Sequence, residues 1–169
     1  MAENKRFTKI KFDGSKVTLG YEIPRKDGDP DEFTVFCADL PAPEFDQALQ
    51  ALAVDVAGIC EMPDSDAVKI KVRGVTLTWA HDIMGACITA MKSLKTAQSP
   101  LVLNTPHLPS ESYSDTDCPV LRTDCIHRLD RLALEAERYL NGERAQGSLL
   151  SVVDDAGVAV PVGEAIAIQ

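Results

Sequence analysis

Apolar and polar residues alternate from residue 7 to residue 23, which is the pattern of two antiparallel strands with one buried face. Ile10 and Phe12 alternate with lysines, and the apolar residues from Val17 to Ile23 then recur at every second position. Asp13-Gly14 lies between the two runs and favours a tight turn. The pattern therefore predicts a β-hairpin, and the alternation of FTVFC, residues 33 to 37, predicts a third strand after a polar loop.

The period changes to that of a helix between residues 41 and 63. Pro43 suits the first turn of a helix, and Pro63 ends it. Acidic residues at positions 44 and 46 complement the positive end of the helix dipole. The predicted apolar stripe consists of Phe45, Leu49, Leu52, Val56 and Ile59.

Period-two alternation returns with Val68, Ile70 and Val72, and the parity switches at Gly74 before Val75. A shift of face at a glycine is typical of a β-bulge, so residues 68 to 79 are predicted to form one long, bent strand that buries Trp79. Residues 84 to 94 and 101 to 104 are expected to add two further strands.

A second helix is predicted from about Pro119 to Leu140, with Asn141-Gly142 as its stop. Its apolar stripe consists of Leu121, Cys125, Leu129, Leu132, Ala136 and Tyr139.

The predicted order of elements is βββα followed by βββα, which indicates an α+β fold. Two such units can form one curved antiparallel sheet packed on two main helices. We expect residues 1–150 to form a single α+β domain and residues 151–169 to form a C-terminal tail. The tail is rich in small apolar residues, and we hypothesise that it adds a hairpin to a sheet edge or forms a contact in a homo-oligomer.

Composition places the chain among globular proteins, because 45% of its 169 residues are apolar and 25% are charged. The five cysteines are odd in number and form no C-x-x-C pair, which favours reduced thiols and a cytoplasmic location. No apolar run resembles a secretory leader or reaches the roughly 20 residues of a membrane helix.

The net charge of −9 disfavours extended binding to nucleic acid, which depends on clustered Lys and Arg. Acidic residues outnumber basic ones twelve to two between Glu22 and Asp66. This stretch is interpreted either as a solvated surface or as a docking surface for a partner protein.

Motifs for metals and for catalysis are weak. The acidic loop 27 to 32 resembles the start of a calcium loop, but Glu32 and Ala38 occupy positions that need Gly and Glu. Cys118, Cys125 and His127 lack the paired spacing of a zinc site. The sequence therefore predicts no metal, no cofactor and no assigned catalytic residue. A Cys118 nucleophile with His107 as its base, oriented by Asp115 or Asp117, remains an alternative.

The phosphate-loop, dinucleotide-binding, zinc-protease and serine-hydrolase motifs are all absent from the sequence. Their absence favours a binding protein over an enzyme.

Two groups of residues are candidates for ligand binding. The segment LNTPH ends a predicted strand in a loop stiffened by prolines, and it offers polar groups from Asn104, Thr105 and His107. Arg128 and Arg131 lie three residues apart on one helix face and could bind a phosphate or carboxylate. The alternatives are that LNTPH is a structural connector and that the arginines form surface ion pairs.

The segments RGV (73–75), LVLNTPH (101–107) and ERYLNGERAQGSL (137–149) resemble a family of small, uncharacterised proteins of tailed bacteriophages and prophages. The likeness covers roughly residues 5 to 150 and implies an accessory role in the host bacterial cytoplasm. The expected function is that of a non-enzymatic binding protein that sequesters a small anionic, nucleotide-like ligand and so counters a host defence signal. The alternative is an acidic inhibitor, DNA mimic or accessory of phage DNA metabolism that binds a host or phage protein.

Overall fold

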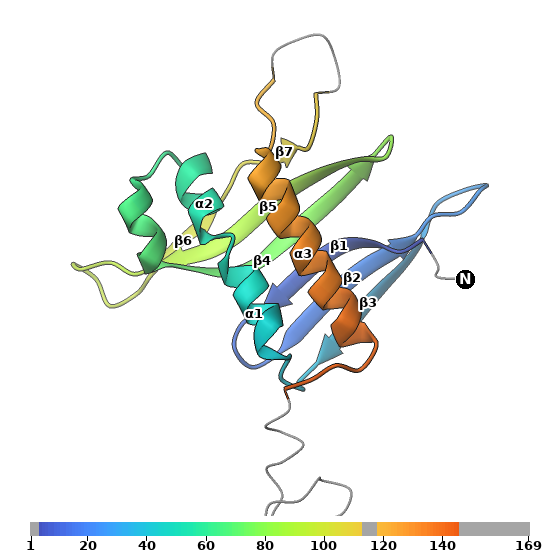
Figure 1. Cartoon of the computed structure of the whole chain (residues 1–169), viewed down its shortest axis with the longest axis horizontal. Helices are drawn as coiled ribbons and strands as arrows, with labels where there is room; N and C mark the ends of the chain where they lie inside the picture. The colour runs from blue at the N-terminus through green and yellow to red at the C-terminus, as the bar shows by residue number, and fades with distance from the viewer. Residues whose placement is uncertain (1–3, 113–117, 146–169) are drawn as a thin grey trace, which may run out of the picture.

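The computed structural model describes residues 4–112 and 118–145, which form one antiparallel sheet with helices on one of its faces (Figure 1). Seven strands build the sheet: β1 (Arg6–Phe12), β2 (Val17–Ile23), β3 (Asp31–Cys37), β4 (Ile70–Ala80), β5 (Ile83–Lys92), β6 (Leu101–Asn104) and β7 (Leu108–Pro109). The order across the sheet is β3-β2-β1-β4-β5-β6, and β7 pairs with β5 beyond the end of β6. The α+β fold predicted from the sequence is confirmed.

Three α-helices and a short 3₁₀ helix lie against the sheet: α1 (Pro43–Gln50), α2 (Ala53–Ile59), η1 (Asp64–Lys69) and α3 (Thr123–Leu140). Figure 1 shows α1, α2 and α3 on the same face, so both helical segments cover a single layer of strands. Within the part of the chain that the structure describes, no helix covers the opposite face of the sheet. We call this opposite face, formed by side chains such as Thr76, Thr78 and Thr89, the outer face.

The helix predicted between residues 41 and 63 is divided at Ala51 and Leu52 into α1 and α2. Gln50, the last residue of α1, fixes this point, because its amide donates to the Val72 carbonyl and accepts from the Val72 N–H, each at 2.9 Å. This side-chain clamp holds α1 on β4. The predicted apolar stripe is nevertheless buried at all positions except the half-buried Ile59.

The predicted β-bulge is present, since the pairing of β4 with β5 shifts between Val72 and Gly74. A Cβ on Gly74 would lie 2.9 Å from the Ile10 carbonyl oxygen, so the close approach of β1 favours glycine there. The prediction that Val68 begins this strand is wrong. Val68 is 89% exposed at the end of η1, and β4 begins at Ile70.

The core lies between the sheet and the helices. Its largest fully buried side chains come from β1, β2, β4 and β5 on one side and from α1, α2 and α3 on the other. They include Ile10, Leu19, Phe45, Leu49, Leu52, Val72, Val75, Ile88, Leu129 and Leu132. Trp79 packs at the edge of this core, and its indole N–H donates to the Phe7 carbonyl at 2.9 Å. The tail predicted for residues 151–169 lies outside the described residues.

Candidate functional site

The segment LNTPH continues the sheet beyond β6. Thr105 is 3% exposed, its N–H donates to the Ile88 carbonyl at 2.9 Å, and its Oγ1 accepts from the Ile88 N–H at 2.8 Å. The Thr105 hydroxyl thus takes the place of the backbone carbonyl that would accept from the Ile88 N–H in a regular antiparallel pair. It does so where the chain bulges between β6 and β7. Thr105 has a structural role in this arrangement, and its hydroxyl already has a partner.

Asn104 and His107 lie on the outer face of the sheet. Thr89 donates from Oγ1 to Asn104 Oδ1 at 2.8 Å, and His107 Nε2 shares a hydrogen bond of 2.7 Å with Thr78 Oγ1. The His107 imidazole lies over Gly85, where any Cβ would clash with the ring. These contacts tie the segment to β4 and β5 on the side away from the helices.

Pro106 and Leu108 alternate with His107, and they border a groove on the helical side of the sheet. The groove has a volume of about 530 Å³ and runs between α2, the start of α3 and β7. Its walls are mostly apolar. The residues that line it are Asp55, Gly58, Ile59, Glu61, Pro106, Leu108, Pro119, Val120, Arg122 and Cys125.

The positive charge of the groove lies at the start of α3. Arg122 is the N-cap residue, is exposed, and has no ion-pair partner among the described residues. No side chain of the described residues caps this helix end, so the first backbone N–H groups of α3 add to the positive potential, which Asp124 in the same turn partly offsets. Glu61 is the exposed acid of the groove, and its backbone has a positive φ of 56° after the end of α2.

The Asp55 carboxylate, which lines the groove, forms an ion pair with Arg128. Arg128 Nε donates to Asp55 Oδ2 at 2.8 Å, and the neighbouring guanidinium nitrogen donates to Oδ1 at 3.2 Å. The Asp55 side chain is 5% exposed, whereas that of Arg128 is 31% exposed. The hydrogen bond that Arg128 donates to Asp55 raises the pKa of Arg128 above its ordinary value. The pair joins α2 to α3 and holds the carboxylate in a fixed orientation.

Cys125 contributes a neutral thiol to the groove. Burial, with the neighbouring Asp55 carboxylate as a smaller cause, raises the pKa of Cys125 to about 12. The thiol is therefore protonated at neutral pH and is not an activated nucleophile.

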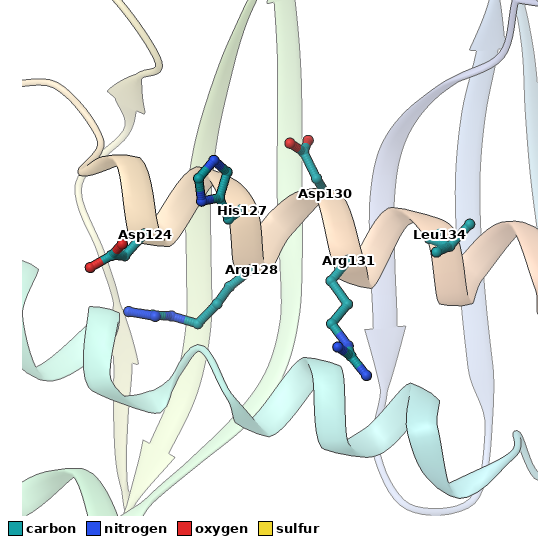
Figure 2. A pocket seen from close by; sticks show the side chains of 6 residues that line it. All are labelled: Asp124, His127, Arg128, Asp130, Arg131 and Leu134. Carbon is teal, nitrogen blue, oxygen red and sulfur yellow. The ribbon is translucent and has the colours of Figure 1, made fainter.

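Arg131 lies outside the groove, and together with Arg128 it lines a shallow depression of about 550 Å³ on the exposed side of α3. Figure 2 shows Arg128 and Arg131 pointing toward the α1 and α2 ribbon, while His127 and Asp130 point away from it. Arg131 has no hydrogen-bond or ion-pair partner among the described residues, whereas Arg128 is occupied by Asp55. The two arginines thus share one depression, in which Arg128 already donates to Asp55.

The structure does not bring the five predicted ligand residues together. Asn104 and His107 face away from the helices, Thr105 is buried, and Arg128 and Arg131 belong to α3. The groove instead uses Pro106 and Leu108 of the same segment together with Arg122. Alternation from Pro106 to Leu108 would have indicated this in the sequence, because it puts Pro106 and Leu108 on the face opposite His107, whereas the bulge after Asn104 could not be read from the sequence.

The described residues contain no group of three or more His, Cys, Asp and Glu side chains arranged to hold a metal ion. Cys118 and His127 are exposed while Cys125 is buried, so these three side chains have different surroundings. Asp115 and Asp117, proposed partners of His107, lie outside the described residues.

No family model, no curated protein and no solved structure matches the chain. Among the described helices, none has both the length and the apolar character of a membrane span.

Proposed function

We propose that the protein binds a small anion with a flat apolar part, such as a nucleotide, in the groove between α2, α3 and β7. The single observation that carries the proposal is the position of Arg122 at the rim of an otherwise mostly apolar groove. Volumes of roughly 300 to 1,000 Å³, with apolar walls and a few polar groups, are typical of small-molecule sites. The groove, at about 530 Å³, falls in this range.

Each part of such a ligand has a complement in the groove. Ile59, Leu108 and Val120 offer apolar surface to a ring. Arg122 and the uncapped start of α3 offer donors to a phosphate or carboxylate. This arrangement supports binding of a ligand that is both anionic and partly apolar.

The chemistry of the groove supports binding without turnover. Cys125 is its thiol, and the raised pKa of about 12 keeps this sulfur protonated. The Asp55 carboxylate is engaged by Arg128. In the setting that the resemblance to phage proteins suggests, such a protein would sequester a nucleotide signal of the host defence and leave it intact.

Thermal unfolding with a panel of nucleotides tests the proposal. A ligand present at about 100 times its dissociation constant should stabilise the protein by roughly 2.7 kcal/mol. Arg122→Ala should weaken binding about tenfold or more, because a hydrogen bond to a charged group contributes about 1.5–3 kcal/mol. Arg131→Ala is the matched control on the same helix and should bind as the unmodified protein does. No stabilisation by any nucleotide would contradict the proposal.

A second candidate function is favoured by the edge strand β3. Among the strands that the structure describes, β3 pairs with β2 alone, and its exposed aromatic side chains include Phe36, which is 69% exposed. The strand carries no Lys or Pro, the residues that commonly protect an edge. Because β3 lies within the acidic stretch 22 to 66, it could bind a protein partner. Part of that acidity is neutralised internally, for example by the Asp66–Lys92 pair at 2.7 Å.

Pull-down from bacterial lysate at low and at high salt distinguishes the two candidates. A protein partner of β3 should be lost with Phe36→Thr and kept with Arg122→Ala. Recovery of no specific protein at either salt concentration would contradict this second function.

A further inference from the structure

We infer that Asp55 accepts a hydrogen bond from an amino group of the ligand, so that the groove selects nucleotides whose base carries an exocyclic amino group. The inference rests on the proposed function and names the ligand class for the same groove. Three features of the structure support it: the acceptor capacity of the Asp55 carboxylate, the open space at Gly58, and the position of the positive charge.

The carboxylate of Asp55 has acceptor capacity beyond the ion pair. Arg128 donates one hydrogen bond to each oxygen, at 2.8 and 3.2 Å. An ionised carboxylate has about four acceptor positions on its two oxygens, so this pairing leaves part of the capacity unused. The Cys125 thiol, which also interacts with Asp55, is only a weak donor. A ligand donor in the groove would therefore meet a fixed and partly unsatisfied acceptor.

Gly58 lines the groove together with Asp55. It lies three residues after Asp55, a separation that puts two residues on neighbouring positions of one helix face. A Cβ built on Gly58 would have no heavy atom within 4 Å. The groove is thus open at Gly58, on the same helix face as Asp55, and this space could accommodate the edge of a base.

The remaining groups set the orientation of the ligand. Arg122 lies at the start of α3 and attracts the phosphate, while Ile59 and Leu108 offer apolar surface to the ring. A carboxylate accepts from the amino group of cytosine in protein–nucleic acid recognition, and the amino group of adenine offers the same donor. A keto oxygen at the same place would face the negative charge and would be rejected. The expected ligands therefore carry an adenine-type or cytosine-type amino edge.

Matched pairs of nucleotides test this inference by isothermal titration calorimetry on the full chain. AMP should bind at least about tenfold more tightly than IMP, and CMP at least about tenfold more tightly than UMP, because IMP and UMP carry a keto oxygen in place of the amino group and an N–H in place of the neighbouring ring-nitrogen acceptor. Equal affinities within both pairs would overturn the role of Asp55 and leave the proposed function intact. Absence of binding by all four would overturn both.

Two sets of variants separate recognition from folding. Asp55→Asn should reduce the AMP to IMP affinity ratio to about one, which a merely structural role would not do. An unchanged ratio would overturn the inference. Gly58→Leu should fill the open space at Gly58 and lower AMP affinity at least about tenfold, while Gly58→Ala serves as its matched control. Binding of AMP to Gly58→Leu with undiminished affinity would also overturn the inference.

Discussion

Arg128 and Asp55 are 73 positions apart in the chain and are joined by two hydrogen bonds, at 2.8 and 3.2 Å. The pair connects α2 with α3, the last helix of the described residues. It also fixes the wall of the groove in which we place the ligand.

Removal of Arg128 should destabilise the protein, because the carboxylate of Asp55 would be left buried without its partner. We expect Arg128→Ala to lower the free energy of unfolding by about 1–2 kcal/mol, less than for a fully buried pair, since Arg128 is partly exposed to solvent. Urea denaturation measures the loss. Arg131→Ala, at an exposed position without a partner among the described residues, should change stability by less than about 0.5 kcal/mol. Equal losses in the two variants would contradict the role of the pair.

Thr105 tests whether LNTPH is a structural segment. Thr105→Val removes the hydroxyl that accepts from the Ile88 N–H and keeps the size of the side chain. A buried donor left without a partner costs about 1–3 kcal/mol, so the urea midpoint should fall accordingly. Thr105→Ser retains the hydroxyl and should recover most of that loss. If the Thr105→Val variant were as stable as the unmodified protein, the hydrogen bond between Thr105 and Ile88 would contribute nothing to stability.

Gly85 and His107 should be coupled. A Cβ on Gly85 would clash with the His107 ring and would lie 2.8 Å from Thr78 Oγ1, so Gly85→Ala is expected to cost about 1–3 kcal/mol. His107→Ala alone removes one exposed hydrogen bond and should cost about 0.5–1 kcal/mol. The double variant, with Gly85→Ala and His107→Ala together, should lose less free energy of unfolding than the two single variants lose in sum. Strict additivity in a thermodynamic cycle would show that the ring does not occupy that space.

The turn between β1 and β2 should make stability depend on pH in the acid range. The backbone N–H groups of Ser15 and Lys16, each bonded to the Asp13 carboxylate, lower the pKa of Asp13 from 3.8 to about 2. A lowered pKa means that the stabilisation is present above about pH 4 and is lost as the pH falls toward 2. Asp13→Ala should therefore be less stable than the unmodified protein at pH 7, with a difference that disappears near pH 2. Thermal unfolding from pH 2 to 7 measures this.

The matched control for the turn is Asp64→Ala, because Asp64 is exposed and has no hydrogen-bond partner among the described residues. A constant difference for Asp13→Ala over the same range would contradict the assignment.

Most of the strands could be predicted because their apolar residues alternate with period two and because one face is buried. The bulge at Gly74 was visible as a parity switch between Val72 and Val75. The division of the first helix could not be predicted, since it depends on the contact of Gln50 with Val72, which lies 22 residues away in sequence. Apolar and polar residues already alternate at Val68, before β4 begins at Ile70, so the pattern predicts a strand that is too long at this end.

The candidate site was harder to predict than the fold. Polarity singled out Asn104 and His107, but their hydrogen bonds are made to Thr89 and Thr78 within the sheet. The groove forms only where segments that are distant in sequence come together in the fold. In the sequence alone, the apolar residues of its walls cannot be distinguished from residues of the core. Arg122 was indistinguishable from other helix arginines until its place at the start of α3 was known.

Backbone amide NMR during titration with AMP is the most direct measurement of the central claim, which is that the ligand occupies the groove between α2, α3 and β7. We expect the largest chemical-shift changes at Gly58, Leu108 and Arg122. Changes at Asn104 and His107, on the outer face, should be small. Shift changes centred on the outer face, or an unchanged spectrum at millimolar AMP, would contradict it.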